Sequence, residues 1–202
     1  MVKSKALRTL EILCSILPTA FWVLILFSFE EPSLAITTLL CALIHESGHI
    51  ICIFLMNEKK LSLRGAINGF RIKTNRVRSY NEEILIYLSG PFANLFASSL
   101  CFVMSIILDE AFLIGAIINL FTALSNLMPI RGYDGYGAIM AIMKKRESSD
   151  IALRALSCIS SGLIFSLCLL SLYFINRYSG GYWIFAVFFV SMIKELKTGL
   201  EE

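Results

Sequence analysis

The chain alternates between long apolar runs and short polar segments. The apolar runs cover about residues 12–29, 33–56, 83–108, 111–130, 151–175 and 180–193. About 20 apolar residues in a helix are enough to cross the hydrocarbon core of a bilayer, and only the last run is clearly shorter. Tyr182 and Trp183 before that run and lysines after it are typical of a membrane interface, so we count it as a span. The pattern predicts about six transmembrane helices.

Composition supports the same class of protein. Hydrophobic residues make up 57% and charged residues 16% of the 202 residues, and the mean hydropathy is +0.75. These values lie outside the usual range of soluble domains. The six cysteines lie in apolar runs and form no CxxC pair, which argues against a disulfide framework or a zinc ribbon. We therefore expect an all-α polytopic membrane protein in which residues 1–202 form a single transmembrane domain.

The basic residues indicate the orientation of the helices. If the amino terminus is cytoplasmic, only Arg177 of the 18 lysines and arginines falls outside the cytoplasmic segments. The exterior turns are short and acidic, and such an asymmetry fixes orientation in a cell membrane with both termini in the cytoplasm. A cleaved secretory signal is the alternative for the first run. That run is longer than a signal core, and Glu30-Glu31-Pro32 interrupts it, so a retained helix is favoured.

The cytoplasmic segment after the second run contains a turn signal. Asn68-Gly69 lies between the short β-compatible stretches LSLRGAI and FRIKTNRV. An Asn-Gly pair between such stretches is a strong signal for a two-residue hairpin turn. We predict a small cytoplasmic β-hairpin at the membrane edge, with a disordered basic loop as the alternative.

The sequence HESGH, residues 45–49, places two imidazoles and a carboxylate inside the second apolar run. The chain has two histidines, and both lie here. On a helix, His45 and His49 lie one turn apart on one face and can reach the same ion, and Glu46 can accept a proton from water on that ion. Ionisable residues in a membrane helix are costly and usually mark function, although ordinary polar residues are the alternative. Two histidines and a carboxylate with one open position suit catalytic Zn²⁺, so we predict one zinc ion per chain.

The third ligand has to come from elsewhere in the chain. Asp109 is expected on the exterior side, and Asp150 lies beyond the cytoplasmic loop. Asp134 follows the fourth run in NLMPIRGYDGYG, where Pro129 breaks the helix and allows the chain to fold back. Asp134 is therefore the best candidate. Cys41, one turn before His45, is a possible competitor, and a small packed residue is the simpler interpretation of it.

Three motifs together resemble the site-2 protease family of intramembrane zinc metalloproteases. They are HESGH in one predicted helix, LSGPFANL in the next, and NLMP with Asp134-Gly135 in the one after. They occur in the family's order over about residues 33–137, which we take as the catalytic core, with peripheral helices at about 12–29, 151–175 and 180–193. Without an obvious PDZ insertion, the chain is most similar to the compact branch that includes the sporulation pro-sigma-factor processing proteases.

The resemblance implies a ligand set and a reaction. Zinc would be held by His45, His49 and Asp134, and Glu46 would activate water. The reaction would be hydrolysis of a peptide bond in a transmembrane or membrane-associated segment of a protein substrate. Many family members have a further glycine after Asp134-Gly135, whereas this chain has Tyr136.

The resemblance also implies residues that position the substrate. These are Gly90 and Asn94 of the Gly-xxx-Asn element and Asn126 of the Asn-xx-Pro element. Judged from the residues alone, helix packing is the alternative for all three. The hairpin at Gly69 would offer an edge strand that binds an extended substrate through main-chain hydrogen bonds.

The partners expected from the family are membrane proteins and the lipid bilayer. Substrates would be a tethered transcription or sigma factor, an anti-sigma factor or a signal peptide remnant, and a regulatory membrane protein would gate the enzyme. No nucleic-acid partner is expected. The rival interpretation is a metal-binding membrane transporter, or a proteolytically inactive relative that binds membrane proteins. A soluble-type metallopeptidase is a weaker rival, because its helix would not lie among five other spans.

Overall fold

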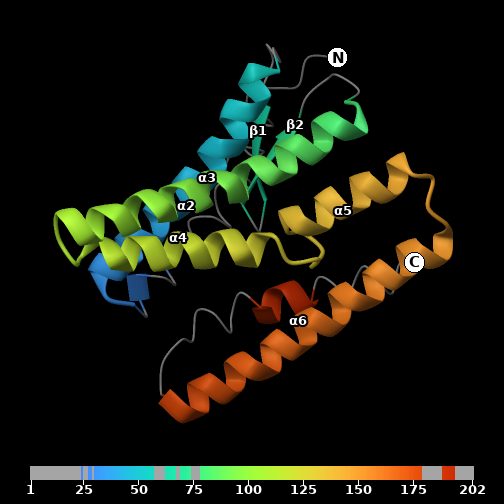
Figure 1. Ribbon diagram of the computed structural model, residues 1–202. Helices are drawn as coiled ribbons and strands as arrows, with labels where there is room; N and C mark the ends of the chain where they lie inside the picture. Colours follow the sequence, from blue (N-terminus) through green and yellow to red (C-terminus); the bar gives the residue numbers. More distant parts are fainter. Residues whose placement is uncertain are drawn as a thin grey trace, which may run out of the picture.

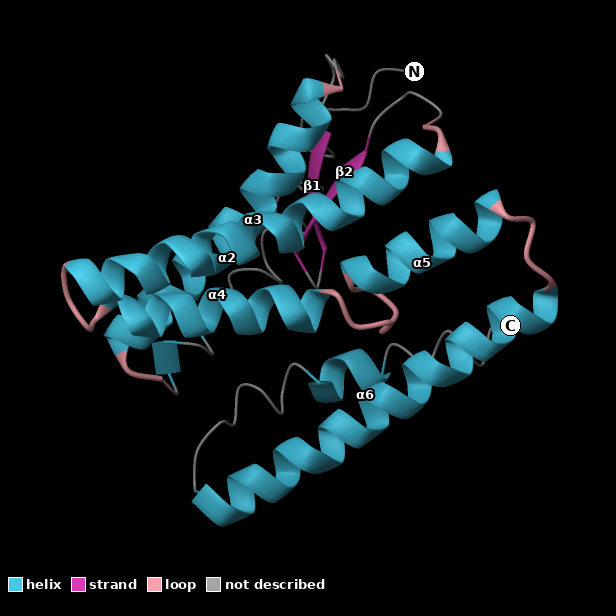
Figure 2. Ribbon diagram, viewed as in Figure 1, coloured by secondary structure: helices cyan, strands magenta, loops and turns pink. Residues whose placement is uncertain are grey.

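The computed structural model describes residues 30–56, 62–66, 69–73, 78–178 and 188–193, together with residues 24, 27 and 28. Figures 1 and 2 show the named elements, which are almost all helical. In chain order they are α2 (Pro32–Leu55), β1 (Ser62–Ala66), β2 (Gly69–Lys73), α3 (Tyr80–Ile107), α4 (Phe112–Asn126), α5 (Asp134–Lys145) and α6 (Asp150–Tyr178).

Helix α3 is the centre of the packing. It contacts α2, α4 and α5, and Figure 1 shows α3 and α4 lying side by side. Helix α6 has few contacts with the other described helices and lies apart from α2, α3 and α4. Because α3 contacts three other helices, its side chains and carbonyls can meet groups from α2, α4 and α5 in one interior.

The start of α3 is defined by a capping box. The Ser79 hydroxyl accepts from the Glu82 N–H at 3.3 Å, and the Ser79 N–H donates to the Glu82 carboxylate at 2.9 Å. Two backbone donors at the exposed helix end are thereby satisfied. Lys145 of α5 donates to the Asn81 side chain at 2.7 Å, so the end of α5 is tied to the beginning of α3.

The outer faces of the long helices are apolar. Phe54, Phe96 and Ile106 are 72%, 74% and 71% exposed, whereas polar residues such as His45 and Asn94 are buried. Helix α2, helix α3 and the Asp150–Tyr173 part of α6 are long and apolar enough to cross a membrane. Such an apolar exterior around a polar interior suits lipid as the surrounding medium. The predicted runs 33–56, 83–108 and 151–175 are therefore confirmed as apolar helices.

The fourth run was predicted to span residues 111–130, and here the structure differs. Helix α4 has 15 residues and ends at Asn126, so it is about 22 Å long, against a hydrocarbon core of about 30 Å. Pro129 disfavours helix at the residue before it, and Gly132 has φ of 95°, so the chain turns sharply. It then enters α5, in a segment that we expected to be a cytoplasmic loop. The runs at 12–29 and 180–193 lie largely outside the described residues, so the six-span count stays a prediction.

The segment after α2 contains an antiparallel strand pair. Residues of β1 pair with β2 from Ser62 opposite Lys73 to Ala66 opposite Gly69. The turn was predicted at Asn68-Gly69, but Gly69 is already the first residue of β2 and pairs with Ala66. Residues 67 and 68, between the two strands, lie outside the described residues. The position of this pair relative to a membrane edge stays a prediction.

Candidate metal centre

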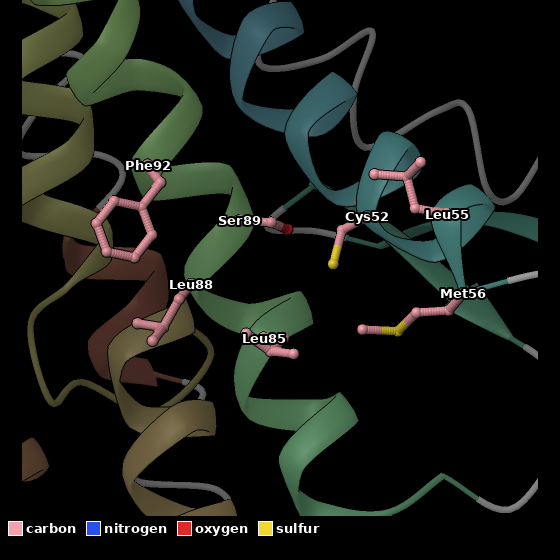
Figure 3. Close-up of a pocket in the computed structure, with 7 residues that line it drawn as sticks. All are labelled: Cys52, Leu55, Met56, Leu85, Leu88, Ser89 and Phe92. Carbon is pink, nitrogen blue, oxygen red and sulfur yellow. The ribbon is translucent and has the colours of Figure 1, made fainter.

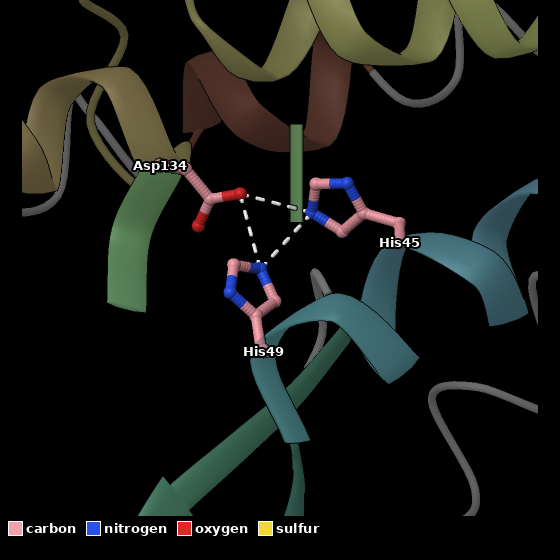
Figure 4. Close-up of side chains that lie close together, drawn as sticks. All are labelled: His45, His49 and Asp134. Atoms are coloured by element: carbon pink, nitrogen blue, oxygen red, sulfur yellow. Dashed lines mark hydrogen bonds and ion pairs between the residues drawn. The ribbon is translucent and has the colours of Figure 1, made fainter. Parts of the chain in front are cut away.

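Helices α2 and α5 bring His45, His49 and Asp134 together. One Nε2 or carboxylate oxygen of each residue lies within 4.8 Å of the others. Asp134 Oδ2 is 2.9 Å from His45 Nε2 and 3.2 Å from His49 Nε2, and the two Nε2 atoms are 3.2 Å apart. Figure 4 shows the three side chains converging on a common point. Both histidines are buried, and Asp134 is half-buried.

The triangle of ligand atoms has the size that a tetrahedral metal requires. Zinc bonds of about 2.0–2.2 Å at the tetrahedral angle place ligand atoms roughly 3.3–3.5 Å apart. The observed edges of 2.9, 3.2 and 3.2 Å are only slightly shorter. A small outward movement of the side chains would therefore accommodate the ion.

The hydrogen bonds of the rings determine which atoms face the centre. The His45 Nδ1–H donates to Asn94 Oδ1 at 2.8 Å, and the His49 Nδ1–H donates to the Ile86 carbonyl at 2.7 Å. With hydrogen on Nδ1, each Nε2 presents a lone pair, so neither can donate to Asp134 Oδ2. That oxygen is accordingly buried without a hydrogen-bond partner. Three electron pairs facing one another repel, and a cation between them removes the repulsion.

The donor set suits a cation. Asp134 supplies a carboxylate oxygen, and each ring presents Nε2 because its Nδ1 donates to α3. One carboxylate and two imidazoles are the ligands of a catalytic zinc site with one position left open.

Two glycines allow α2 and α3 to approach closely beside the histidines. A methyl group at Gly48 would come within 2.6 Å of the Ser89 carbonyl oxygen and 2.8 Å of Ala93 Cβ. A methyl group at Gly90 would overlap both imidazole rings. Small residues at a helix crossing permit this approach. As a result, the Ile86 carbonyl and the Asn94 amide of α3 reach the two rings of α2.

The loop between α4 and α5 delivers Asp134. A side chain at Gly135 would overlap the carbonyls of Leu127 and Met128, so only glycine allows the first turn of α5 to pack on this loop. Ile130 is fully buried and anchors the loop. Asp134 lies in the first turn of α5, where the helix dipole favours a negative charge.

Helix α6 braces the same loop. The backbone N–H of Arg131 donates to Ser160 Oγ at 2.7 Å, and its guanidinium donates to Ser157 Oγ at 2.8 Å. The guanidinium carbon also lies 5.9 Å from the centre of the Tyr136 ring. Tyr136, which stands where many family members have glycine, is buried in this packing. Within the described residues, α6 thus contributes to the position of Asp134 through Arg131.

The remaining predicted site residues occupy different environments. Glu46 follows His45 in α2 and is half-buried. Asn94 is fully buried and contacts His45 directly. Asn126 ends α4, and its amide donates to the Thr122 carbonyl at 2.9 Å. Gly69 begins β2. Cys41 is buried and is not a member of the ligand cluster found among the described residues.

Sequence reasoning missed one residue of this interior. Asn119 of α4 is buried, and its side-chain oxygen accepts from the Asn94 amide at 2.8 Å. The signal was available, because Asn119 is an amide inside an apolar run, as are Asn94 and Asn126, and a polar group there needs a partner.

An apolar cavity lies beside the cluster, between the end of α2 and the first half of α3. Its volume is 380 Å³. Ser89 Oγ belongs to its wall and lies 3.3 Å from His49 Nδ1, so the cavity adjoins one of the candidate ligands. Figure 3 shows the lining residues, which besides Ser89 are Cys52, Leu55, Met56, Leu85, Leu88 and Phe92.

The fold and the cluster define a helical protein with apolar outer faces and a buried His-His-Asp candidate metal centre. No family model matches the chain, and no curated protein matches it. A solved structure, the site-2 protease from Methanocaldococcus jannaschii, is similar with a TM-score of 0.60 and 18% sequence identity, over 90% of this chain and 86% of that one. The chain therefore has the fold of that protease, in agreement with the resemblance of its motifs.

Proposed function

We propose that the chain is an intramembrane zinc-dependent endopeptidase of the site-2 protease family, similar to its compact branch. The observation that carries the proposal is the convergence of His45, His49 and Asp134 on one point, with Glu46 next to the first ligand. The similarity of fold to a site-2 protease supports the same conclusion. The substrate would be a membrane protein with a cleavable transmembrane or membrane-associated segment.

The residues of the chain divide the chemistry between them. Zinc, when bound, supplies Lewis acidity toward the scissile carbonyl and the attacking water. Glu46 accepts a proton as the water oxygen bonds to the carbonyl carbon, and it delivers that proton to the amine nitrogen as the C–N bond breaks. His45, His49 and Asp134 hold the ion, and the hydrogen bonds of the two rings to Asn94 and Ile86 keep their Nε2 atoms directed at it.

The position of the cluster suits cleavage inside the membrane near one surface. His45 and His49 lie ten and six residues before Leu55, the last residue of α2, which corresponds to about 15 and 9 Å along the helix. We place this end on the cytoplasmic side, with both termini in the cytoplasm, because the basic residues gather there. Water has to reach the cluster through the protein interior.

A substrate helix must be unwound before its carbonyls can be attacked, because helical hydrogen bonds hide them. We assign the binding of the unwound segment to the β1–β2 pair, in which Gly69 is the first residue of β2, through main-chain hydrogen bonds. Asn126, at the end of α4, would orient the segment, whereas Asn94 would act on the reaction through His45, with which it is hydrogen-bonded. A regulatory membrane protein that controls access would be a further partner.

The test compares wild-type protein with Glu46→Gln in native-like membranes, measuring both bound zinc and the loss of membrane segments from other proteins. The variant is isosteric and does not alter the three candidate ligands. We expect it to keep its zinc and to lose cleavage by about 10²–10⁴-fold, the typical contribution of a general base. Cleavage that persists in Glu46→Gln would contradict the assignment of the base. Zinc binding with no cleavage in either protein would instead favour a transporter or an inactive binder.

A further inference from the structure

A chain of buried side-chain amides connects α4 to the first candidate ligand. The Asn119 amide nitrogen donates to the Gly115 carbonyl at 2.8 Å, and its oxygen accepts from the Asn94 amide nitrogen at 2.8 Å. That nitrogen donates also to the Cys41 carbonyl at 2.9 Å. The Asn94 oxygen accepts from His45 Nδ1 at 2.8 Å. Asn94 and Asn119 are 0% and 2% exposed, so no water competes for these groups.

The donor and acceptor of each hydrogen bond in this series of amides are fixed by groups that can only accept. The carbonyls of Gly115 and Cys41 carry no hydrogen, so the amide atoms that face them must be NH₂ groups. Both hydrogens of the Asn94 nitrogen are thereby used, one on Cys41 and one on Asn119. Its oxygen is left for His45, and an oxygen there requires hydrogen on Nδ1. Rotation of the Asn94 amide by half a turn would place its oxygen against two other oxygens.

The consequence for His45 is the choice of tautomer. With hydrogen on Nδ1, the Nε2 atom presents a lone pair to the centre; with a donor in place of the Asn94 oxygen, the hydrogen would move to Nε2 and block it. His49 is oriented differently, because a backbone carbonyl, that of Ile86, accepts from its Nδ1. Only His45 therefore depends on side chains for its tautomer.

We propose that Asn119 is a positioning residue for the metal: acting through Asn94, it keeps His45 in the tautomer whose Nε2 can bind the ion. The inference rests on the proposed metal site. Loss of the Asn119 oxygen leaves one buried Asn94 hydrogen without an acceptor, and the amide then turns away from the geometry that holds Nδ1.

The first measurement is made without metal. Because the chain has only two histidines, ¹⁵N-histidine labelling yields four ring nitrogens, and their chemical shifts report where each hydrogen lies. Removal of His49 by His49→Gln assigns the His45 signals. In mildly alkaline buffer, wild-type protein should show hydrogen on Nδ1 of both rings. In Asn119→Leu, His45 should gain the Nε2–H tautomer, while His49 stays unchanged as an internal control.

Two further variants separate the hydrogen bond from helix packing. Ser98→Ala removes another buried hydrogen bond between α3 and α4, from Ser98 Oγ to the Ala116 carbonyl at 2.7 Å, which shares no donor or acceptor with the amide chain. It should leave both tautomers unchanged. Asn119→Asp keeps an oxygen toward Asn94. Burial favours the neutral carboxyl group, whose O–H can donate to the Gly115 carbonyl in place of the amide N–H, so this variant should restore the wild-type pattern for His45. If Asn119→Leu is not obtained folded, Asn119→Ser tests the same loss, because its hydroxyl is too short to replace the amide oxygen.

The second measurement is the affinity for Zn²⁺, determined by competition with a chelator. We expect the dissociation constant to rise about tenfold in Asn119→Leu, the lower end of the range for residues that orient a ligand, and to change little in Ser98→Ala and Asn119→Asp. An unchanged His45 tautomer in Asn119→Leu, equal changes in Asn119→Leu and Ser98→Ala, or failure of Asn119→Asp to restore the pattern would each overturn the proposal. Wild-type protein with the expected tautomers but no affinity for zinc would overturn the proposed function instead.

Discussion

Gly90→Ala tests how closely α3 must approach the candidate ligands. At an ordinary helical position the change stabilises a protein by about 0.5–1 kcal/mol, because alanine has the higher helix propensity. At Gly90 the new methyl group would lie 2.6 Å from His49 Cε1 and 2.8 Å from His45 Cε1, and closer still to His49 Nε2. Overpacking of this kind costs about 1–3 kcal/mol. The overlap therefore outweighs the propensity, and we expect a net loss of up to about 2 kcal/mol.

The effect on the metal should be larger than the effect on the fold. Relief of the overlap requires the rings to move, and the methyl group occupies space next to the atoms that bind the ion. Displaced ligand rings typically lower metal affinity by about 10–100-fold. Thermal unfolding in detergent and zinc competition with a chelator measure the two effects separately.

Gly162→Ala is the matched control. Gly162 lies in α6, where an added methyl group would meet nothing within 4 Å. It should gain the helix propensity of about 0.5–1 kcal/mol and leave zinc affinity unchanged. The reasoning is refuted if Gly90→Ala matches Gly162→Ala in both stability and affinity, because α3 would then not lie against the rings as described.

Three further changes test other parts of the site. Ser160→Ala removes the acceptor of the Arg131 N–H and should lower zinc affinity severalfold, because the loop before Asp134 is then held less firmly. Ser166→Ala, at an exposed position of the same helix, should leave the affinity unchanged. Equal zinc affinities of the two variants in a chelator titration would show that this hydrogen bond does not position Asp134. Leu88→Trp fills the cavity beside His49 and should shift cleavage toward substrates with smaller side chains, which mass spectrometry of the products would reveal. An unchanged set of products would show that the cavity does not bind substrate. Gly69→Pro removes the N–H with which β2 begins and should lower cleavage without loss of zinc, so unchanged turnover would argue against the strand pair as a substrate clamp.

The histidine pair was the most predictable part of the site. Two ionisable rings one helical turn apart in an apolar run are costly unless they bind a common partner. The helix that contains them begins and ends within a residue of the predicted run. Asp134 was found by elimination, because the chain has few aspartates. The reversal of direction at Pro129 was also expected, whereas the twelve-residue α5 that follows it was not. Its mixed composition resembles a loop in sequence, and its stability comes from packing on α3.

The contacts that orient the ligands could not be read from the sequence. Asn94 was expected to position substrate, yet the structure places it against His45. Asn119 received no role, since nothing in a single sequence shows which amide of α4 faces which amide of α3. Gly48 gave no local signal either, because its importance depends on the Ser89 carbonyl of a neighbouring helix. Such pairings depend on how helices cross, and periodicity within one helix does not contain that information.

The central claim is that His45, His49 and Asp134 together hold one zinc ion. Elemental analysis of purified wild-type protein and of Asp134→Leu, prepared side by side without chelators, tests it most directly. The account predicts one zinc per chain in the wild type and a small fraction of that in the variant. Wild-type protein without stoichiometric zinc, or a variant that retains the full amount, would contradict it.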